Sequence, residues 1–390
     1  MPVERFYRLC LTWALVCLVS VFGTLWVRAE EMDSFPDNQL HAQAAVLVDG
    51  ETGRILYEKN ANKEMAMAST TKIMTCLVAL ENSKPDDIVT ISQYAASMPD
   101  VQLNAIEGDV FYIEDLLYAL MLESHNDVAV AIAEHVGGSE KEFANLMNER
   151  AKEIGCTNTH FVTANGLDAE EHYTTASDLA KITVEALKND AFCNIVQTEY
   201  YKFSNVNESR TYELNNKNAF LNQMEGAYGV KTGFTNDAGY CFVGASKKNK
   251  VNLISVVLGS GWPPNKTWKW EDTWTLMNYG FDHFTYREIG QAQMDVGHLT
   301  ISNGRKSEVR LRTDTSIEDI LLGSSEKITI KMVKELKREA PIAKDEIVGW
   351  IYYQVNNVTV KKYPIYPVES VLRENYIDVL KKIGSLWILF

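Results

Sequence analysis

Apolar residues recur along the chain in three successive patterns, which predict a mixed helical and stranded region, a β-rich region and a terminal amphipathic helix. In the first region, apolar runs at 44–48 and 55–57 flank the turn sequence Asp-Gly-Glu-Thr-Gly and indicate a β-hairpin. Segments with helical spacing follow, and strand-like runs close the region: helices at 71–80, 113–122, 128–136, 140–154 and 176–187, and strands at 240–245 and 252–258. This order predicts an α+β fold, in which helices pack on a mainly antiparallel sheet whose first and last strands pair.

The pattern changes after a last helical segment at 274–283. Short β-rich runs then alternate with turns, which indicates a separate small β domain over residues 284–366. Residues 367–390 place apolar side chains at helical spacing with charged residues between them, and the last five residues are almost wholly apolar. This pattern favours an amphipathic helix lying in a membrane interface. A helix docked on its own domain is the alternative.

Residues 1–29 have the layout of a secretory signal peptide. Arg5 and Arg8 precede an uncharged run at 9–27, and small residues stand three and one positions before a cleavage point after Ala29. The run is also long enough to span a bilayer, so an uncleaved anchor is the alternative. We therefore expect an exported, extracytoplasmic protein, with a polar linker over residues 30–42.

Composition limits the function classes. The chain has 390 residues, of which 46% are hydrophobic and 23% charged, as in ordinary globular proteins. The net charge of -14 argues against a nucleic-acid binder. Four cysteines lie beyond the signal sequence, without a Cys-x-x-Cys pair or a histidine cluster beside them: Cys76, Cys156, Cys193 and Cys241. We therefore expect no metal site and free thiols, although disulfides are permitted outside the cell.

Ser69-Thr-Thr-Lys72 places a hydroxyl and an amine three residues apart on one face at the start of a helix. The lysine can act as a base only if burial or a neighbouring cation lowers its pKa. Alone the motif is weak, because a helix cap with a surface lysine has the same sequence. A second Ser-x-x-Lys at 324–327, in the predicted β domain, is interpreted as chance.

Two further motifs follow in the chain. Ser124-His125-Asn126 lies between two predicted helices, where a cap or turn would use the same residues. Lys231-Thr232-Gly233 leads into a strand and offers a charge, a hydroxyl and a close approach to the backbone. A plain turn is the alternative. Together, in this order, the three motifs are the signature of active-site serine penicillin-recognising enzymes.

The surrounding sequence resembles the D-alanyl-D-alanine carboxypeptidases of the low-molecular-mass penicillin-binding proteins, the S11 peptidase family. The resemblance covers residues 40–283, the β domain and the tail. Its further motifs are Thr-His-Phe at 159–161, Asn-Gly-Leu-Asp at 165–168, Thr-Thr-Ala-Ser-Asp at 174–178 and Gly-Phe-Thr-Asn-Asp-Ala-Gly-Tyr at 233–240. It implies a β-lactamase/transpeptidase-like fold with a penicillin-binding D,D-peptidase catalytic domain over residues 43–283. It also implies removal of the terminal D-Ala from peptidoglycan pentapeptides ending in D-Ala-D-Ala, inhibition by β-lactams, and no cofactor.

The resemblance assigns catalytic roles to three residues. Ser69 is expected to be the nucleophile that forms the acyl-enzyme, and Lys72 the base that takes its proton. Ser124 is expected to relay a proton to the leaving group.

The remaining motif residues are expected to bind the substrate. Asn126 would hold Lys72 and the substrate amide. Lys231 would lower the pKa of Lys72 and attract the anionic substrate, and Thr232 would contact its carboxylate. Gly233 completes this motif, and the backbone N–H of Phe234 would join that of Ser69 in an oxyanion hole.

Two positions depart from the family pattern. Phe234 stands where some relatives carry His, and Lys269 aligns where some carry an Arg near the substrate carboxylate. Lysine cannot reproduce the bidentate contact of arginine, so the sequence leaves this carboxylate contact open.

Three other functions use parts of the same sequence. A Ser-His-Asp triad could use His125 with Asp127 or Asp168, but no Gly-x-Ser-x-Gly elbow is present. A class A β-lactamase would need a deacylating glutamate, for which Glu213 is a superficial match. A catalytically silent wall-binding protein is disfavoured, because all the motif residues are intact.

Overall fold

The computed structural model describes residues 39–289, 294–314 and 318–387. The predicted signal peptide lies outside the described residues, as does most of the predicted linker. The last linker residues are packed: Leu40 and Ala42 are buried, and the His41 ring stacks on Trp268 at 4.2 Å between centroids. The carboxylate of Asp272 accepts hydrogen bonds from the backbone N–H groups of His41 and Ala42.

A five-stranded antiparallel sheet with the order β2-β1-β9-β8-β7 forms the centre of the first domain. Its strands are β1 (Ala44–Asp49), β2 (Ile55–Lys59), β7 (Ala227–Thr235), β8 (Gly239–Lys248) and β9 (Val251–Leu258). The first strand pairs with the last, with Val46 opposite Val256, as the sequence predicted. Strand β7 is at the edge of this sheet, which leaves its outer side available to a ligand.

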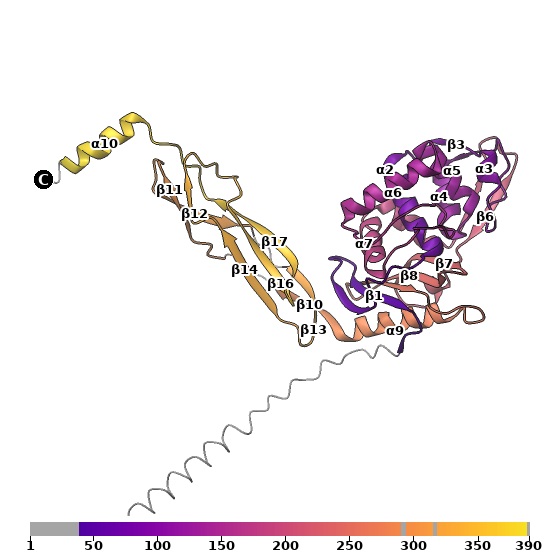
Figure 1. The fold of residues 1–390 in the computed structure, drawn as a ribbon. Coiled ribbons are helices and arrows are strands. Elements are labelled where there is room, and N and C mark those ends of the chain that lie inside the picture. The colour runs from indigo at the N-terminus through magenta and orange to yellow at the C-terminus, as the bar shows by residue number, and fades with distance from the viewer. Residues whose placement is uncertain (1–38, 290–293, 315–317, 388–390) are drawn as a thin grey trace, which may run out of the picture. The chain divides into compact units, whose positions relative to one another are not determined.

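Helices cover both faces of the sheet (Figure 1). They are α2 (Lys72–Asn82), α4 (Ile113–Leu122), α5 (Asn126–Gly137), α6 (Glu140–Ile154), α7 (Ala176–Ala186), α8 (Asp190–Gln197) and α9 (Trp268–His283). Helix α7 packs on β1 and β9, whereas α9 packs on β8 and β9. Figure 1 shows α9 across the sheet from the cluster that holds α2, α4, α5 and α6. Because both faces are covered, every residue of β1 is buried.

Local signals explain several helix ends. The Ser139 side chain accepts a hydrogen bond from the Glu142 N–H at the start of α6, and Gly155 ends that helix at a φ of 90°. Thr175 caps α7 through the Asp178 N–H. Helix α2 has no side-chain cap and is buried along most of its length, so packing rather than capping maintains it.

Several short elements escaped the sequence analysis because each is only a few residues long. They are the 3-10 turns η2 (Ala68–Thr71) and η3 (Ala219–Asn222), helix α3 (Gln93–Ala96), the pair β3 (Ile88–Thr90) and β4 (Val110–Tyr112), and the hairpin β5 (Tyr200–Ser204) with β6 (Thr211–Asn215). The four cysteines are free, and Cys76, Cys156 and Cys241 are buried.

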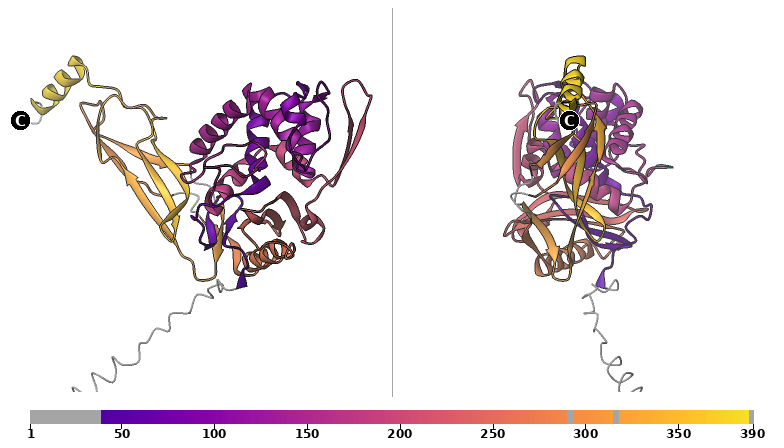
Figure 2. Two further views of the ribbon diagram at one scale, coloured as in Figure 1. Left: turned by 45° about the vertical axis from the view of Figure 1, so that its right-hand side comes forward. Right: turned by 90° about the vertical axis from the view of Figure 1, so that its left-hand side faces the viewer.

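The β-rich region contains a six-stranded sheet with the order β14-β16-β17-β12-β11-β15 and a two-stranded pair, β10 with β13. The strands are β10 (Phe284–Ile289), β11 (His298–Ser302), β12 (Glu308–Thr313), β13 (Glu318–Gly323), β14 (Ile328–Lys334), β15 (Lys337–Glu339), β16 (Gly349–Val355) and β17 (Val358–Pro367). Figure 2 shows these strands from two sides. Their inward side chains, such as Leu299 and Ile351, form a second hydrophobic core, distinct from the one around α2.

Helix α10 (Tyr376–Trp387) follows the β-rich region. Its first turn is joined to that region by an ion pair of 2.9 Å between Asp378 and Arg305. Apolar side chains of α10 are exposed, including Ile377, Leu380 and Ile383. Among the described helices, none combines the length and apolar character needed to cross a membrane.

Candidate active site

Ser69 lies in the short 3-10 turn η2, immediately before the buried helix α2. The turn brings its Oγ to 3.0 Å from the Nζ of Lys72, the first residue of α2. Ser69 is half-buried, whereas Lys72 is completely buried. The hydroxyl is thus accessible while the amine beside it is shielded from water.

Besides the Ser69 hydroxyl, two fixed hydrogen-bond acceptors face the Lys72 amine. Asn126 Oδ1 lies 2.9 Å and the Asn165 carbonyl oxygen 2.5 Å from Nζ. The Asn126 amide nitrogen donates to the carbonyls of Pro99 and Asp100, both at 3.1 Å, so its oxygen faces Lys72. In a neutral amine these acceptors take two hydrogens and leave the lone pair for the Ser69 hydroxyl.

Burial and charge both favour that neutral amine. Desolvation lowers the pKa of Lys72 well below its ordinary value, and the positive charge of Lys231 lowers it further, against an opposing effect of Asp127. Burial also lowers the pKa of Lys231 to about 7. A neutral amine in this position can accept a proton from the Ser69 hydroxyl.

The second motif lies at the start of α5. Ser124 adopts a left-handed backbone with a φ of 74°, and His125 occupies the cap position without a side-chain capping bond. The Ser124 Oγ is buried without a hydrogen-bond partner among the described residues. Since its hydroxyl bonds to no helix N–H among the described residues, Ser124 does not act as a cap. An unpaired buried hydroxyl is unfavourable, so a bound ligand that pairs with it would gain stability.

The third motif lies on the edge strand β7. Lys231 is buried and Thr232 half-buried, while Phe234 is 39% exposed. A Cβ placed on Gly233 would lie 3.1 Å from the backbone nitrogen of Ser69, closer than most such contacts. Glycine at this position therefore lets β7 run directly against the turn that carries Ser69.

The sequence analysis missed the loop at 159–174 as a source of site residues. Asn165 supplies the carbonyl that faces Lys72, and Gly166 packs so closely that an added Cβ would lie 2.1 Å from the Ala68 carbonyl oxygen. His172 is buried and lies 2.9 Å from the Thr71 hydroxyl. The resemblance had already singled out residues 165–168, but a backbone carbonyl leaves no side-chain signal.

Lys269, the residue aligned with a family arginine, is buried rather than open to the site. Its Nζ donates to the Lys266 carbonyl at 2.6 Å and lies over the rings of Tyr240 and Trp270, at 4.7 and 4.6 Å. Burial lowers its pKa to about 8. The exposed Phe234 ring also packs against Tyr240, with the two ring centroids 4.6 Å apart.

The alternative catalytic groups are engaged elsewhere. Asp127 accepts from the N–H groups of Leu103 and Val128, at 3.0 and 2.9 Å, and the His125 Nε2 lies 3.4 Å from Glu123. No triad therefore forms between His125 and Asp127.

Two other sequence matches are also unsuitable for catalysis. Glu213 lies in the hairpin β5–β6, half-exposed and paired with Lys202 at 2.7 Å, so it is not a buried deacylating base. Ser324 and Lys327 are exposed in the turn between β13 and β14, in agreement with the interpretation of that match as chance.

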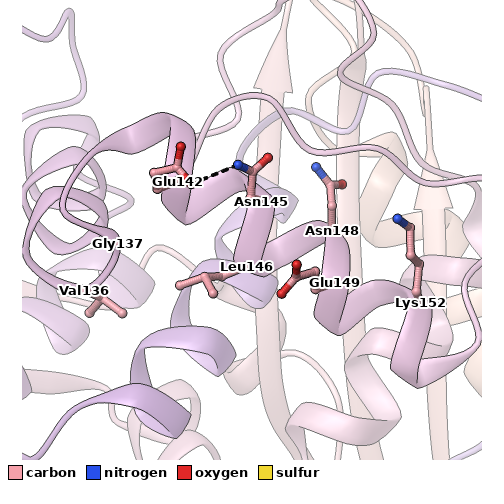
Figure 3. Close-up of a pocket in the computed structure, with 8 residues that line it drawn as sticks. All are labelled: Val136, Gly137, Glu142, Asn145, Leu146, Asn148, Glu149 and Lys152. Atoms are coloured by element: carbon pink, nitrogen blue, oxygen red, sulfur yellow. Dashed lines mark hydrogen bonds between the residues drawn. The ribbon is translucent and has the colours of Figure 1, made fainter.

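A surface pocket beside α6 is separate from the three motifs (Figure 3). Its lining includes Glu142, Asn145 and Asn148 and none of the motif residues. Among the described residues, no group of three or more His, Cys, Asp or Glu side chains is placed to hold a metal ion.

Two family models together match most of the chain. Residues 29–261 match the family model described as D-alanyl-D-alanine carboxypeptidase, and residues 284–373 match the model of the penicillin-binding protein 5 C-terminal domain. The D-alanyl-D-alanine carboxypeptidase DacF of Bacillus subtilis (strain 168) is 30% identical over 358 residues, covering 90% of each protein.

Two solved structures are also similar. Penicillin-binding protein 5 from Haemophilus influenzae superposes with a TM-score of 0.71 at 26% identity, covering 86% of this chain and 98% of that chain. A mutant of the Streptomyces K15 DD-transpeptidase superposes with a TM-score of 0.58 at 35% identity, covering 62% of this chain and 98% of that chain. Both the sequence and the fold are therefore shared along most of the chain, and the protein belongs to the S11 family as a serine-type D-alanyl-D-alanine carboxypeptidase.

Proposed function

We propose that Ser69 attacks the carbonyl carbon between the two D-alanines while Lys72 takes the proton from its hydroxyl. The observation that carries this assignment is the Lys72 amine, which lies 3.0 Å from Ser69 Oγ with two other acceptors already facing it. The terminal D-Ala leaves as a free amino acid, and water then hydrolyses the acyl-enzyme. No cofactor takes part in these steps.

Ser124 is proposed to pass a proton to the departing amine. Its buried Oγ, which has no partner among the residues that the structure describes, has a free donor and a free acceptor, as a relay between Lys72 and the leaving nitrogen requires. Asn126 positions Lys72 and is proposed to bind the substrate amide as well.

Strand β7 is proposed to bind the substrate as an added strand at the sheet edge. The backbone N–H groups of Ser69 and Phe234 would stabilise the oxyanion, and the fit of Gly233 against Ser69 brings these two segments together. Thr232 would donate to the terminal carboxylate. Lys231 would attract that carboxylate, whose negative charge in turn favours the protonated lysine.

The physiological substrate is proposed to be the peptidoglycan pentapeptide, and β-lactams are proposed to acylate the same serine. Residues 43–283 would form the catalytic domain and residues 284–366 a spacer. Helix α10 supports attachment to the outer surface of the cell membrane, because Ile377, Leu380 and Ile383 are exposed rather than docked on the β-rich region. Export would follow from the signal sequence at 1–29.

The acylation assignment is tested by the intact mass of the purified chain before and after benzylpenicillin, beside Ser69→Ala. We expect one lasting penicillin adduct on the wild type, none on the variant, and release of D-Ala from a D-Ala-D-Ala peptide by the wild type only. An adduct on Ser69→Ala would refute the assignment. Consumption of penicillin without a lasting adduct would indicate a β-lactamase.

The membrane assignment is tested by deleting residues 367–390. Activity should remain while binding to anionic lipid vesicles is lost. If a signal-cleaved truncated protein still binds the vesicles, α10 is not the attachment site.

A further inference from the structure

His172 has both ring nitrogens engaged, and their partners define its tautomer. The backbone N–H groups of Val162 and Thr163 point at Nδ1, at 3.0 and 3.4 Å. Nδ1 must therefore be an acceptor, and the proton must reside on Nε2. The Nε2–H then donates to the Thr71 hydroxyl oxygen, 2.9 Å away.

Thr71 extends this contact to the catalytic turn. Its hydroxyl donates to the Ala68 carbonyl oxygen at 2.8 Å. Ala68 directly precedes Ser69 and has a φ of 48°, a left-handed conformation that alanine rarely adopts. The turn also lacks a side-chain cap at Met67. Hydrogen bonds to the Ala68 carbonyl therefore help to fix the backbone that orients the Ser69 side chain.

The loop that carries His172 is itself fixed at its other end. Asn148 on α6 makes two hydrogen bonds with the backbone of Phe161, both at 2.8 Å. Asn148 is one of the residues labelled in Figure 3, on the face of α6 that borders the pocket. The imidazole is thus held by a rigid support on one side and bonded to the catalytic turn on the other.

We propose that His172 is a positioning residue, which acts through Thr71 and the Ala68 carbonyl to hold Ser69 in line with Lys72. This inference rests on the proposed role of Ser69 as the nucleophile. It gives the loop at 159–174 two functions, because the same loop supplies the Asn165 carbonyl to the Lys72 amine. The nucleophile and its base would then be aligned by one segment.

The two ring nitrogens can be tested separately. In His172→Asn, the side-chain oxygen can replace Nδ1 as the acceptor for Val162 and Thr163, but the donor to Thr71 is lost. In His172→Gln, the amide nitrogen can reach the position of Nε2 and keep that donor. Thr71→Val removes the hydroxyl at nearly constant volume, and Thr71→Ser retains it.

Thr75→Val provides a matched control. The Thr75 hydroxyl is also buried on α2 and donates to the same loop, at the Ala164 carbonyl, 2.7 Å away. It lies one helical turn beyond Thr71 and makes no hydrogen bond to the Ala68 carbonyl. The control variant therefore loses a buried bond between α2 and the loop without removing the bond that fixes the backbone before Ser69.

The measurements are the second-order rate of acylation of the full chain by benzylpenicillin, followed by intact mass, and the Tm of each variant. We expect His172→Asn and Thr71→Val to slow acylation about 10- to 100-fold, since small misplacements of reacting groups have effects of this size. His172→Gln, Thr71→Ser and Thr75→Val should stay within about 3-fold of the wild type. The double variant His172→Asn/Thr71→Val should be no slower than Thr71→Val alone, because both act through one chain of bonds.

Acylation at the wild-type rate in folded His172→Asn, with only a lower Tm, would overturn the proposal and leave His172 a stabilising residue. If His172→Asn does not fold, the proposal is tested by comparing the acylation rates of Thr71→Val and Thr75→Val. Equal acylation rates for these two variants would overturn the proposal. Failure of the wild type itself to form an adduct would instead refute the role of Ser69.

Discussion

Changing Asn126 to Asp tests directly whether Lys72 acts as a neutral base. The substitution keeps the shape of the side chain but places a carboxylate 2.9 Å from Nζ, in a site where Lys72 is fully buried and Asn126 is 5% exposed. At an effective dielectric constant of about 20, this contact stabilises the ammonium by about 6 kcal/mol. Such an energy lowers the ratio of neutral to charged lysine by roughly 10⁴-fold.

The assay is the rate of acylation by benzylpenicillin as a function of pH. Asn126→Asp should acylate up to about 10⁴-fold more slowly than the wild type at neutral pH, and its rate should rise about tenfold per pH unit as Lys72 loses its proton. Asn126→Ala is the control, because it also loses the hydrogen bonds to the Pro99 and Asp100 carbonyls but adds no charge beside Lys72. Its rate should fall less and should not show this steep recovery.

The reasoning would be refuted by an Asn126→Asp variant whose rate matches that of Asn126→Ala at every pH. In that case the charge state of Lys72 would not limit acylation, and the role of base would belong to another group. The Asn126 amide also donates to two carbonyls, so a loss common to both variants measures positioning alone.

Three further predictions concern stability and are measured by urea unfolding. Gly166→Ala should cost about 3 kcal/mol or more, because a Cβ would lie 2.1 Å from the Ala68 carbonyl at a φ of +82°, whereas Gly138→Ala, with open space around it, should cost about 1 kcal/mol. Asp178→Ala should cost about 3 kcal/mol, since it leaves the N–H groups of Thr157 and Asn158 without their acceptor. Burial lowers the pKa of His172 from 6.5 to about 4, so the unfolded state binds more protons than the folded state between these pH values. The free energy of unfolding should therefore fall by about 3 kcal/mol as the pH drops through this range. The fall should be smaller in His172→Asn, which lacks the imidazole.

Much of the fold could be predicted because its helices and central strands carry strong periodic patterns. The segment predicted as a helix at 140–154 is α6 (Glu140–Ile154), whose ends are marked by Ser139 and Gly155. The pairing of the first and last strands followed from the order of elements alone. The hairpin β5–β6 was missed, because its strands are short and mostly polar on their exposed face.

The candidate site could be predicted only through its three motifs together. Each motif alone has an ordinary structural interpretation, and the order of the three excludes those interpretations. The contacts of Lys72 with the Asn165 carbonyl and of Thr71 with His172 could not be predicted, because they join residues about 90 to 100 positions apart and one of them uses a backbone atom. Contacts of this kind depend on how the loop at 159–174 packs on α2, which single-sequence patterns do not encode.

Several features that local rules disfavour occur at the candidate site. Lysines are charged and exposed in most proteins, yet Lys72 is buried beside a second buried lysine. Ala68 and Ser124 adopt left-handed backbones that disfavour non-glycine residues, and the Ser124 hydroxyl is buried without a partner in the described part of the chain. Each feature is unfavourable for folding, with a cost of about 1 to 3 kcal/mol for the strained or unpaired groups. They lie within or next to the Ser-x-x-Lys, Ser-x-Asn and Lys-Thr-Gly motifs, and the large core around α2 offsets their cost. In the proposed mechanism the same groups supply a neutral amine and a free hydroxyl, so stability would be given up where acylation requires it.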